Sequence, residues 1–280
     1  MQLRSPFYEL AGQFAVDLPG SRAVFSTRRG GCSRGPYESL NLGWLTDDDP
    51  NAVARNRAAL AAMVGAPPMR FVRQVHGAEV VRVGTGRMAA DAVTAASGAS
   101  VPGAAVPGAA GAAGPATAIV GEGNPPPRPR ADGQATATRG IALAALTADC
   151  LPIAIAGDGA VAMVHAGWRG LAAGVVEAGV RAVRDLGASG ELRAAIGPGA
   201  GPCCYEAGAE VHEAFADIPQ AHRGAIVDLK LIARARLRDA GVGETHDIGI
   251  CTICSDPALL FSHRRDGGVT GRQAGVAWLI

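Results

Sequence analysis

Two apolar runs that flank a Gly-Asp-Gly triplet constrain this fold more than any other feature of the chain. The first run is LPIAIA, residues 151–156, and the second is AVAMVHAG, residues 160–167. Glycine and aspartate are typical of tight turns, because glycine adopts left-handed backbone conformations freely and aspartate bonds to its own backbone. The sequence therefore predicts a β-hairpin of two apolar strands, with Cys150 just before the first strand and His165 near the end of the second.

The register of this hairpin decides whether the cysteine and the histidine meet. A two-residue loop at 157–158 would pair Cys150 directly with His165 on one face of the sheet. Such pairs hold their Cβ atoms roughly 4.5–5.5 Å apart. That separation suits two ligands of one zinc ion, and it equally suits a thiol whose pKa an imidazole lowers. We expect the two side chains to lie opposite each other, whereas a loop one residue longer would make the contact diagonal.

Helix-like and strand-like segments alternate along the rest of the chain. Residues 50–64 carry apolar positions at helical spacing, with Asp49 as a candidate N-cap and Gly65 as a stop. Helical patterns also cover 170–187 and 227–242. Strand patterns cover residues 21–31, 69–83, 191–199 and 246–252. This alternation predicts an α/β or mixed α+β fold, in which helices are layered on a mixed β-sheet.

One segment departs from this alternation. From Met88 to Arg130, alanine, glycine and proline dominate, and the sequence has neither a helical nor a strand period. Such composition is typical of low-complexity insertions and long loops. We therefore expect residues 1–280 to form a single compact domain, with residues 88–130 inserted in it.

Charge and hydropathy exclude several classes of partner. The chain has 26 basic and 25 acidic residues, a formal net charge of +1, so it lacks the basic surface that nucleic acids and anionic membranes require. Its N-terminus lacks the charged head and apolar run of a signal peptide, and no apolar stretch is long enough to cross a bilayer. We expect a cytoplasmic protein without nucleic-acid or membrane partners, and its oligomeric state is not predicted.

Cysteine usage fits a reducing compartment. The six cysteines do not resemble a disulfide framework in a chain of this size, and they are read as thiols, nucleophiles or metal ligands. Cys251 and Cys254 have the C-x-x-C spacing of a redox or zinc pair. However, the adjacent pair Cys203-Cys204 does not complete a known zinc-knuckle spacing, so we do not expect a second metal site.

A third candidate ligand follows another strand pattern. His76 ends the alternating run FVRQVH. Together with Cys150 and His165 it would form a His-Cys-His set with one open position, which is typical of catalytic zinc. A single histidine after an apolar strand is more often structural. Asp149 next to the cysteine, and Arg169 shortly after the second histidine, favour a functional site.

Six motifs from Phe25 to the C-terminus resemble the YfiH-like family, which is also called the laccase-domain or polyphenol-oxidase-like family. They are FSTRRGGCSRGPYESLNLG, QVHG, TADCLPI, VHAGWRG, IGPGAGPCCYEAGAEV and FSHRRDGGVTGR. The resemblance implies a compact mixed αβ domain with its site at one end of the sheet. It also implies that His76, Cys150 and His165 bind zinc, the same three residues that the strand patterns indicate.

The resemblance further implies a purine nucleoside phosphorylase. Its substrates would be phosphate and adenosine, inosine, guanosine or S-methyl-5′-thioadenosine, with adenosine deaminase as a related activity. The cofactor would be Zn²⁺, with copper as a substitute. Copper phenol oxidase chemistry is disfavoured, because six histidines in the whole chain are too few for the ligands of a multicopper cluster.

Phosphorolysis requires a phosphate site, and deamination requires a proton acceptor. Arg28, Arg169 and Arg265 lie in the resembling motifs, and guanidinium groups match phosphate oxygens in pairs. Asp149 is the nearest acid in sequence to the candidate metal ligands, where it would accept the proton of a zinc-activated water. Adjacent strand residues point to opposite faces, so this role requires the chain to turn at that position.

Two alternatives remain open from the sequence. In a Cys-His hydrolase, Cys150 would be the nucleophile, with His165 or His76 as its base and an amide as substrate. The family offers such an activity, the editing of peptidoglycan precursors. A zinc-stabilised binding module is the non-enzymatic alternative. Bound metal that protects the cysteine from alkylation would favour the phosphorylase over the hydrolase.

Overall fold

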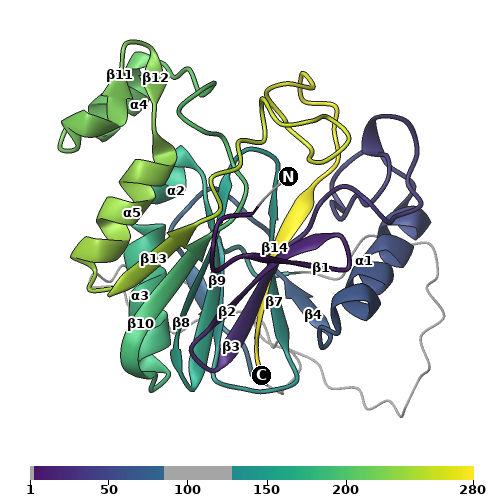
Figure 1. Ribbon diagram of the computed structural model, residues 1–280, viewed down its shortest axis with the longest axis horizontal. Coiled ribbons are helices and arrows are strands. Elements are labelled where there is room, and N and C mark those ends of the chain that lie inside the picture. Colours follow the sequence, from purple (N-terminus) through teal and green to yellow (C-terminus); the bar gives the residue numbers. More distant parts are fainter. Residues whose placement is uncertain (1–2, 85–127) are drawn as a thin grey trace, which may run out of the picture.

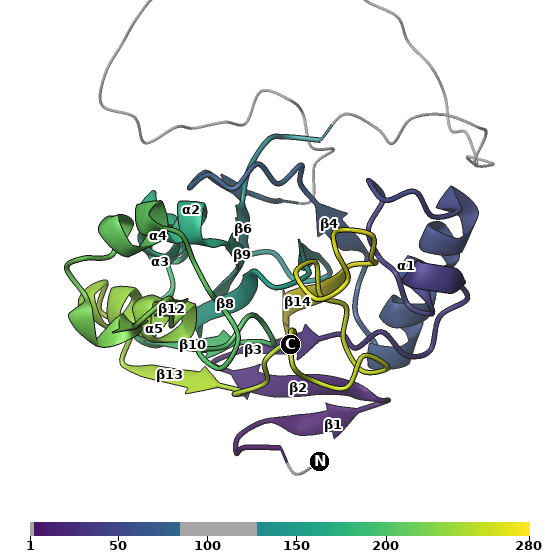
Figure 2. The same ribbon diagram turned by 90° about the horizontal axis from the view of Figure 1, so that it is seen from above.

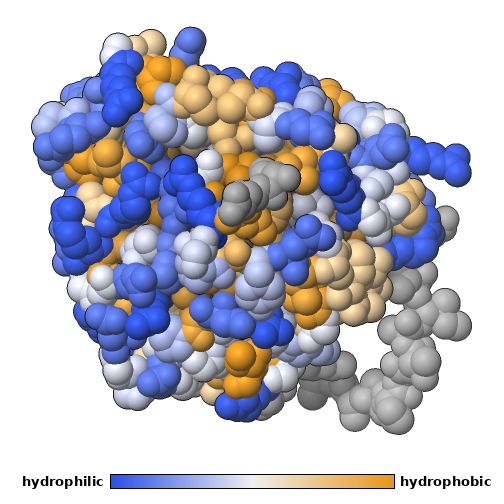
Figure 3. Space-filling model, in the orientation of Figure 1, coloured by the Kyte–Doolittle hydropathy of each residue, from blue (hydrophilic) through white to orange (hydrophobic). Residues whose placement is uncertain are grey.

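The computed structural model describes residues 3–84 and 128–280. The predicted insertion at 88–130 therefore lies almost entirely outside the described residues. Among the described residues, none of the helices is long and apolar enough to cross a membrane. Hydrophilic and hydrophobic residues are interspersed over the face shown in Figure 3.

Two six-stranded sheets form the centre of the molecule (Figure 1). The first has the strand order β1-β2-β3-β14-β7-β4, with bounds Tyr8–Leu10, Gln13–Leu18, Ser21–Phe25, Gln273–Leu279, Ala142–Thr147 and Met69–Phe71. The second has the order β13-β10-β8-β9-β6-β5, with bounds Glu244–Asp247, Ser189–Ile196, Leu151–Asp158, Ala160–Ala166, Gly133–Thr136 and Val80–Arg82. A small third sheet pairs β11 (His222–Arg223) with β12 (Ile226–Val227). Both large sheets contain parallel and antiparallel pairs, as a mixed sheet does.

Helices cover the outer faces of the two sheets, which gives four layers. Figure 2 shows α2 to α5 on one side of the sheets and α1 on the other. The α-helices are α1 (Pro50–Val64), α2 (Trp168–Ala172), α3 (Val175–Asp185), α4 (Ala209–Ala214) and α5 (Leu229–Asp239), and the 3-10 helices are Gly35–Tyr37 and Pro219–Ala221. The predicted class, a mixed α/β fold with helices layered on sheet, is confirmed. The sequence patterns did not predict that there are two large sheets.

The hairpin of β8 and β9 lies at the centre of this arrangement. Ile153 and Ile155 face the layer of α2, α3 and α5, while Ala154 and Ala156 belong to the core between the two sheets. Because both faces are buried, the strands read as continuous apolar runs rather than as an alternating pattern. Full burial of one such isoleucine contributes roughly 1.5–3 kcal/mol.

The predicted register of this hairpin is wrong. Gly157 pairs with Ala160 and Pro152 with His165, so the loop lies one residue later than predicted, at Asp158 and Gly159. Gly159 takes a φ of 92°, which only glycine adopts freely. Gly157 instead remains in β8. A Cβ atom there would lie 2.6 Å from Leu192 Cδ2 of the neighbouring strand, which explains why this position is a glycine. The first glycine of the triplet therefore serves packing, and the second makes the turn.

Other predicted elements form with shifted bounds, whereas the strand pattern at 69–83 forms two short strands, β4 and β5, in different sheets. Asp49 caps α1 by accepting a hydrogen bond from Asn51 N at 2.9 Å, and Gly65 ends the helix with a φ of 65°, as predicted. Gly174 takes a φ of 87° and divides the predicted helix at 170–187 into α2 and α3.

The strand predicted at 246–252 lies earlier, because β13 ends at Asp247. The carboxylate of Asp247 accepts a hydrogen bond from Gly249 N at 2.8 Å, which turns the chain at this point.

Candidate metal centre and cavity

Three side chains converge at the open end of the β8–β9 hairpin. His76 lies in the loop between β4 and β5, Cys150 directly precedes β8, and His165 lies on β9. One ligand atom from each residue lies within 4.8 Å of the other two. The rings of the two histidines meet edge to face, with their centroids 4.9 Å apart. The residues predicted as a His-Cys-His set are therefore brought together.

A buried carboxylate organises two of these residues. Asp132 Oδ1 lies 2.9 Å from His165 Nδ1, and the same side chain accepts the backbone N–H groups of Val75, His76 and Gly77. Asp132 is only 1% exposed, so these bonds are shielded from water. A carboxylate on one ring nitrogen fixes the orientation of a histidine and leaves the other nitrogen for a metal. Sequence analysis missed this residue, since nothing near Asp132 in the chain connects it with residues 56 positions away.

Cys150 and His165 meet diagonally rather than as a direct pair. One step beyond the Leu151–Ala166 pair, Cys150 faces Gly167. A Cβ atom at Gly167 would lie 2.9 Å from Cys150 Sγ and 3.1 Å from His76 Cδ2. The first glycine of the GWRG motif therefore leaves the space in which the three ligands approach one another.

The electrostatics of this group favour a thiolate. Burial raises the pKa of Cys150, but the charge and hydrogen bond of His165 and the hydrogen bond of His76 outweigh it and lower the pKa to about 6. Burial lowers the pKa of His165, whereas Cys150 and Asp132 together raise it to about 9. At neutral pH the metal-free chain thus carries a thiolate beside an imidazolium. A thiolate is the form that binds metals and attacks electrophiles.

This donor set fits a transition metal. Two imidazoles and one thiolate are nitrogen and sulfur ligands that zinc prefers, and three protein ligands leave one position open for water or substrate. Copper accepts the same ligand types. The glycine opposite Cys150 leaves room for the ligands, and the carboxylate on His165 is a partner that metal-bound histidines commonly have.

The three residues line a cavity of about 810 Å³. Its wall combines apolar and aromatic side chains with several arginines: Trp44, Leu45, Val72, Leu146, Ala148 and Tyr205, and Arg73, Arg128, Arg264 and Arg272. A volume of this order accommodates a small organic molecule with its polar groups held at a few points. The candidate metal ligands and the four arginines therefore line the same cavity.

The arginines proposed for phosphate lie outside this wall. Arg28 donates from Nη1 to Pro257 O at 2.8 Å, and its guanidinium lies 4.3 Å from the centre of the Phe261 ring. Arg265 donates to the carbonyls of Thr252 and Leu260 and pairs with the adjacent Asp266. The N–H donors of these two arginines hold loops together.

The third of these arginines is exposed on α2. Arg169 lies over the Trp168 ring at 4.1 Å, and Trp168 packs against the helix-side core. The structure therefore does not bring the three predicted arginines into the cavity.

Asp149 does line the cavity, but its carboxylate has two protein partners. The chain turns at this residue, which takes a φ of 91°. Asp149 and Cys150 are therefore not adjacent residues of one strand, whose side chains would point to opposite faces, and both line the cavity. Asp149 Oδ1 accepts from Thr252 Oγ1 at 2.6 Å, and Oδ2 accepts from Arg264 N at 2.7 Å. The residue connects the segment just before β8, which contains Cys150, with two later loops, and its role in proton transfer stays a prediction.

Sequence analysis missed the arginines that do line the wall. Arg264 donates from Nη1 to Glu206 O at 2.8 Å, and its guanidinium lies 5.2 Å from the centre of the Tyr205 ring. Arg272 also lines the cavity, and burial lowers its pKa. The motif FSHRRDGG contained the signal, since it has two adjacent arginines, but its spacing did not show which one faces the cavity.

Fold and site together define a layered α/β protein with a candidate metal site of two histidines and one cysteine. The chain belongs to the family described as multi-copper polyphenol oxidoreductase laccase, whose model matches residues 22–280. The resemblance to YfiH-like proteins is therefore confirmed.

Relatives with known names and structures cover nearly the whole chain. A purine nucleoside phosphorylase of Pseudomonas aeruginosa is 37% identical over an alignment of 271 residues that covers 92% of this chain and 93% of that protein. The purine nucleoside phosphorylase YfiH of Escherichia coli is 34% identical over 93% of this chain and 95% of its own. The crystal structure of YlmD from Geobacillus stearothermophilus has a TM-score of 0.77 at 30% identity, covering 97% of each chain.

Proposed function

We propose that this protein is a zinc-dependent purine nucleoside phosphorylase of the cytoplasm, with adenosine deamination as a second activity. The observation that carries the proposal is the cavity whose wall contains His76, Cys150 and His165. The names of the relatives support the reaction class. The substrates are phosphate and a purine nucleoside: adenosine, inosine, guanosine or S-methyl-5′-thioadenosine.

The shape and lining of the cavity support a nucleoside. A space of about 810 Å³ is ample for a purine and its ribose. Trp44 and Tyr205 provide aromatic faces on which a purine can stack. The apolar side chains around them exclude water from the base, whereas the sugar and phosphate require polar partners.

We assign the phosphate to Arg264 and Arg272. Both line the cavity, and each uses Nη1 to bond backbone carbonyls, while a guanidinium has further N–H donors for a ligand. Paired N–H donors match the oxygens of phosphate. Arg28 and Arg265 are less suited, because several of their donors already bond carbonyls and Asp266.

The reaction requires phosphate to attack the ribose while the base leaves. An oxygen of hydrogen phosphate forms a bond to C1′, the glycosidic C–N bond breaks, and the leaving base takes up the proton of the phosphate, so that free base and ribose 1-phosphate result. Arg264 and Arg272 would hold the phosphate on one side of the sugar, and Tyr205 would orient the base. When zinc is bound it supplies a Lewis acid beside the substrate. Asp132 would fix the orientation of the His165 ring, and hence the position of this metal ligand, during turnover.

A second candidate, an amide hydrolase, is favoured by one observation. Asp132, His165 and Cys150 form a consecutive series in which a carboxylate orients an imidazole and the imidazole ionises a thiol. This is the arrangement of a nucleophilic triad. In that function Cys150 is metal-free and reacts with electrophiles during turnover.

The test uses purified protein whose zinc content has been measured. Adenosine is incubated with and without phosphate, and adenine, inosine and hypoxanthine are separated by chromatography. We expect adenine and ribose 1-phosphate only with phosphate, and inosine in both conditions. Cys150→Ser should lose the zinc of this site and the turnover, and Cys32→Ser is the matched control. Absence of products in both conditions contradicts the proposal, and purified protein that lacks zinc at this site and has a readily alkylated Cys150 favours the hydrolase.

A further inference from the structure

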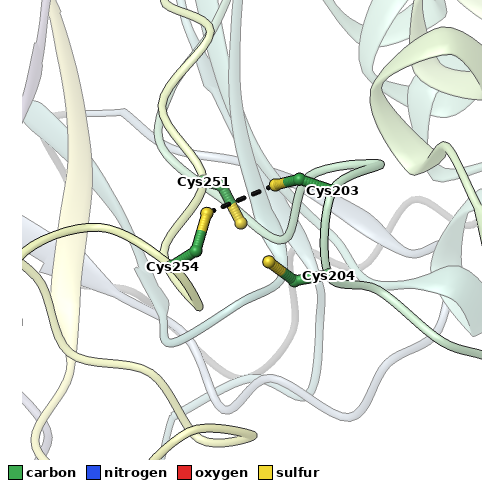
Figure 4. A group of neighbouring side chains, drawn as sticks. All are labelled: Cys203, Cys204, Cys251 and Cys254. Carbon is green, nitrogen blue, oxygen red and sulfur yellow. Dashed lines mark hydrogen bonds between the residues drawn. The ribbon is translucent and has the colours of Figure 1, made fainter.

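Two pairs of cysteines that are separate in the sequence meet in the structure. Cys203 and Cys204 lie in the loop that follows β10, and Cys251 and Cys254 lie in the loop that follows β13. Their four sulfur atoms all lie within 4.8 Å of one another. Figure 4 shows the four side chains converging from the two loops, with Cys203 Sγ 3.3 Å from Cys254 Sγ. The adjacent pair and the C-x-x-C pair are therefore parts of one group.

We propose that these four cysteines bind a second zinc ion, which has a structural role. Zinc with four thiolates is tetrahedral, and a Zn–S distance of about 2.3 Å places the sulfurs about 3.8 Å apart. The distances between sulfur atoms in this cluster are compatible with that value, since one is 3.3 Å and none exceeds 4.8 Å. Four protein ligands close the coordination sphere, so this site has no position for a substrate.

The backbone around the cluster is shaped to bring the sulfurs together. Gly201 donates from its backbone N–H to Cys251 Sγ at 3.2 Å, which is a stabilising contact for a thiolate. A Cβ atom at Gly201 would lie 3.0 Å from Cys251 Cβ and 3.4 Å from the sulfurs of Cys203 and Cys251. A larger residue at this position would force Cys251 to shift by a few tenths of an ångström, so glycine favours the close approach of the two loops.

Backbone hydrogen bonds join the two loops beside the sulfurs. Gly199 forms an isolated parallel bridge with Cys251, and Thr252 N donates to Gly199 O at 3.1 Å. The turn of the first loop is closed by Cys204 N donating to Gly201 O at 3.1 Å. The ligand geometry is thus fixed by the main chain, as a metal site requires.

This site would stabilise one wall of the cavity. Thr252 lies between the two cysteines of the C-x-x-C pair and donates to Asp149, the neighbour of Cys150. Tyr205 directly follows Cys204 and lines the cavity. A metal that joins the two loops therefore holds Asp149 and Tyr205 in place without contacting the substrate.

The first experiment counts zinc per chain by native mass spectrometry of protein purified without chelators. We expect two zinc ions in the wild type and in the control Cys32→Ser. Cys254→Ser and Cys203→Ser should each retain one, and so should His76→Ala, which removes a ligand of the other site. The double variant His76→Ala/Cys254→Ser should retain none.

The second experiment measures the wild type and needs no variant. Metal-free protein is titrated with Co²⁺, whose visible absorption becomes intense when tetrahedral thiolates bind it, and alkylation of each cysteine is followed by peptide mass spectrometry. We expect Zn²⁺ to protect all four cysteines of the cluster.

Three results would overturn the proposal. They are a zinc content that Cys203→Ser and Cys254→Ser leave unchanged, alkylation of the four cysteines that Zn²⁺ does not slow, and a mass lower by two hydrogens that reveals a disulfide between the loops. None of these results concerns turnover, so the proposed phosphorylase activity is tested separately.

Discussion

At the scale of single residues, Asp132 connects the chemistry of the site with its geometry. It is the shared acceptor for the ring of His165 and for the backbone that carries His76. Without this carboxylate, two of the three candidate ligands would lose their fixed positions. The residue contacts ligands rather than substrate, so it is a positioning residue.

Replacement of Asp132 by asparagine tests this role. Asp132→Asn keeps the size but turns one acceptor into a donor that faces backbone N–H groups, which leaves buried donors unpaired. We expect zinc affinity to fall about 10–100-fold. The free energy of unfolding should fall by about 1–3 kcal/mol. Chelator competition and urea denaturation measure the two quantities. Asp158→Asn, at the exposed hairpin turn, should change neither, and unchanged zinc affinity in Asp132→Asn would contradict the assignment.

The ionisation of Cys150 gives a second prediction at this scale. Burial raises its pKa, yet His165 and His76 lower it to about 6. Since this value lies below the ordinary 9.0, the thiolate persists as the pH falls from 9 and is lost only below about 6. In chelator-treated protein, we expect the iodoacetamide alkylation rate at this residue to fall with a midpoint near pH 6. His165→Asn should move the midpoint upward. A midpoint that stays near 9 in the wild type would refute the ionised pair.

The sequence identified the candidate ligands but not the residues that support them. His76, Cys150 and His165 were found because each lies at an end of a strand-like run in the sequence, near glycine or charged residues, which is a local pattern. Asp132 and Arg264 act across the fold, on residues 56 and 115 positions away, and no local pattern encodes such contacts.

At the scale of elements, the β8–β9 hairpin shows what glycine patterns do and do not determine. The triplet predicted a turn correctly but not its register, because each of its two glycines can serve either the turn or the packing. In the structure Gly157 packs against Leu192 of a different strand, and Gly159 makes the turn. A local pattern therefore limits the register to neighbouring alternatives, and tertiary contacts select one.

Substitution of the two kinds of glycine separates these roles. Gly157→Ala places a Cβ atom 2.6 Å from Leu192 Cδ2, so we expect a loss of about 1–3 kcal/mol in the free energy of unfolding. Gly84→Ala is the matched control, since a Cβ atom there meets no described atom within 4 Å. Urea denaturation of both variants measures the difference. Equal stability of the two variants would mean that Gly157 has no packing role.

At the scale of the whole molecule, the alternation of helix and strand predicted the layered mixed α/β class. The patterns did not show that strands from both ends of the chain, β1 to β3 and β14, lie in one sheet together with β7 and β4 from its middle. The pairing of β14 with β3 joins residues about 250 positions apart. The spacing of apolar residues in a sequence shows which face of a helix or strand is buried. It does not show which distant strand pairs with a given strand.

Metal removal provides the prediction for the whole molecule. An ion that binds only the folded chain stabilises it by about 2.7 kcal/mol when its free concentration is 100 times the dissociation constant. For a protein of this size each kcal/mol changes Tm by roughly 2–4 °C. Hence, under those conditions, occupancy of the His76–Cys150–His165 site should account for about 5–10 °C of the wild-type Tm.

Calorimetry with and without a chelator measures this contribution. His76→Ala should lose that part of the zinc-dependent shift and keep the part due to the four-cysteine cluster, whereas Cys32→Ser should behave as the wild type. Because His76 donates no side-chain hydrogen bond to the buried Asp132, its loss removes a ligand while the carboxylate keeps its backbone partners. If chelation lowers the Tm of His76→Ala as much as that of the wild type, the three residues do not hold the stabilising metal.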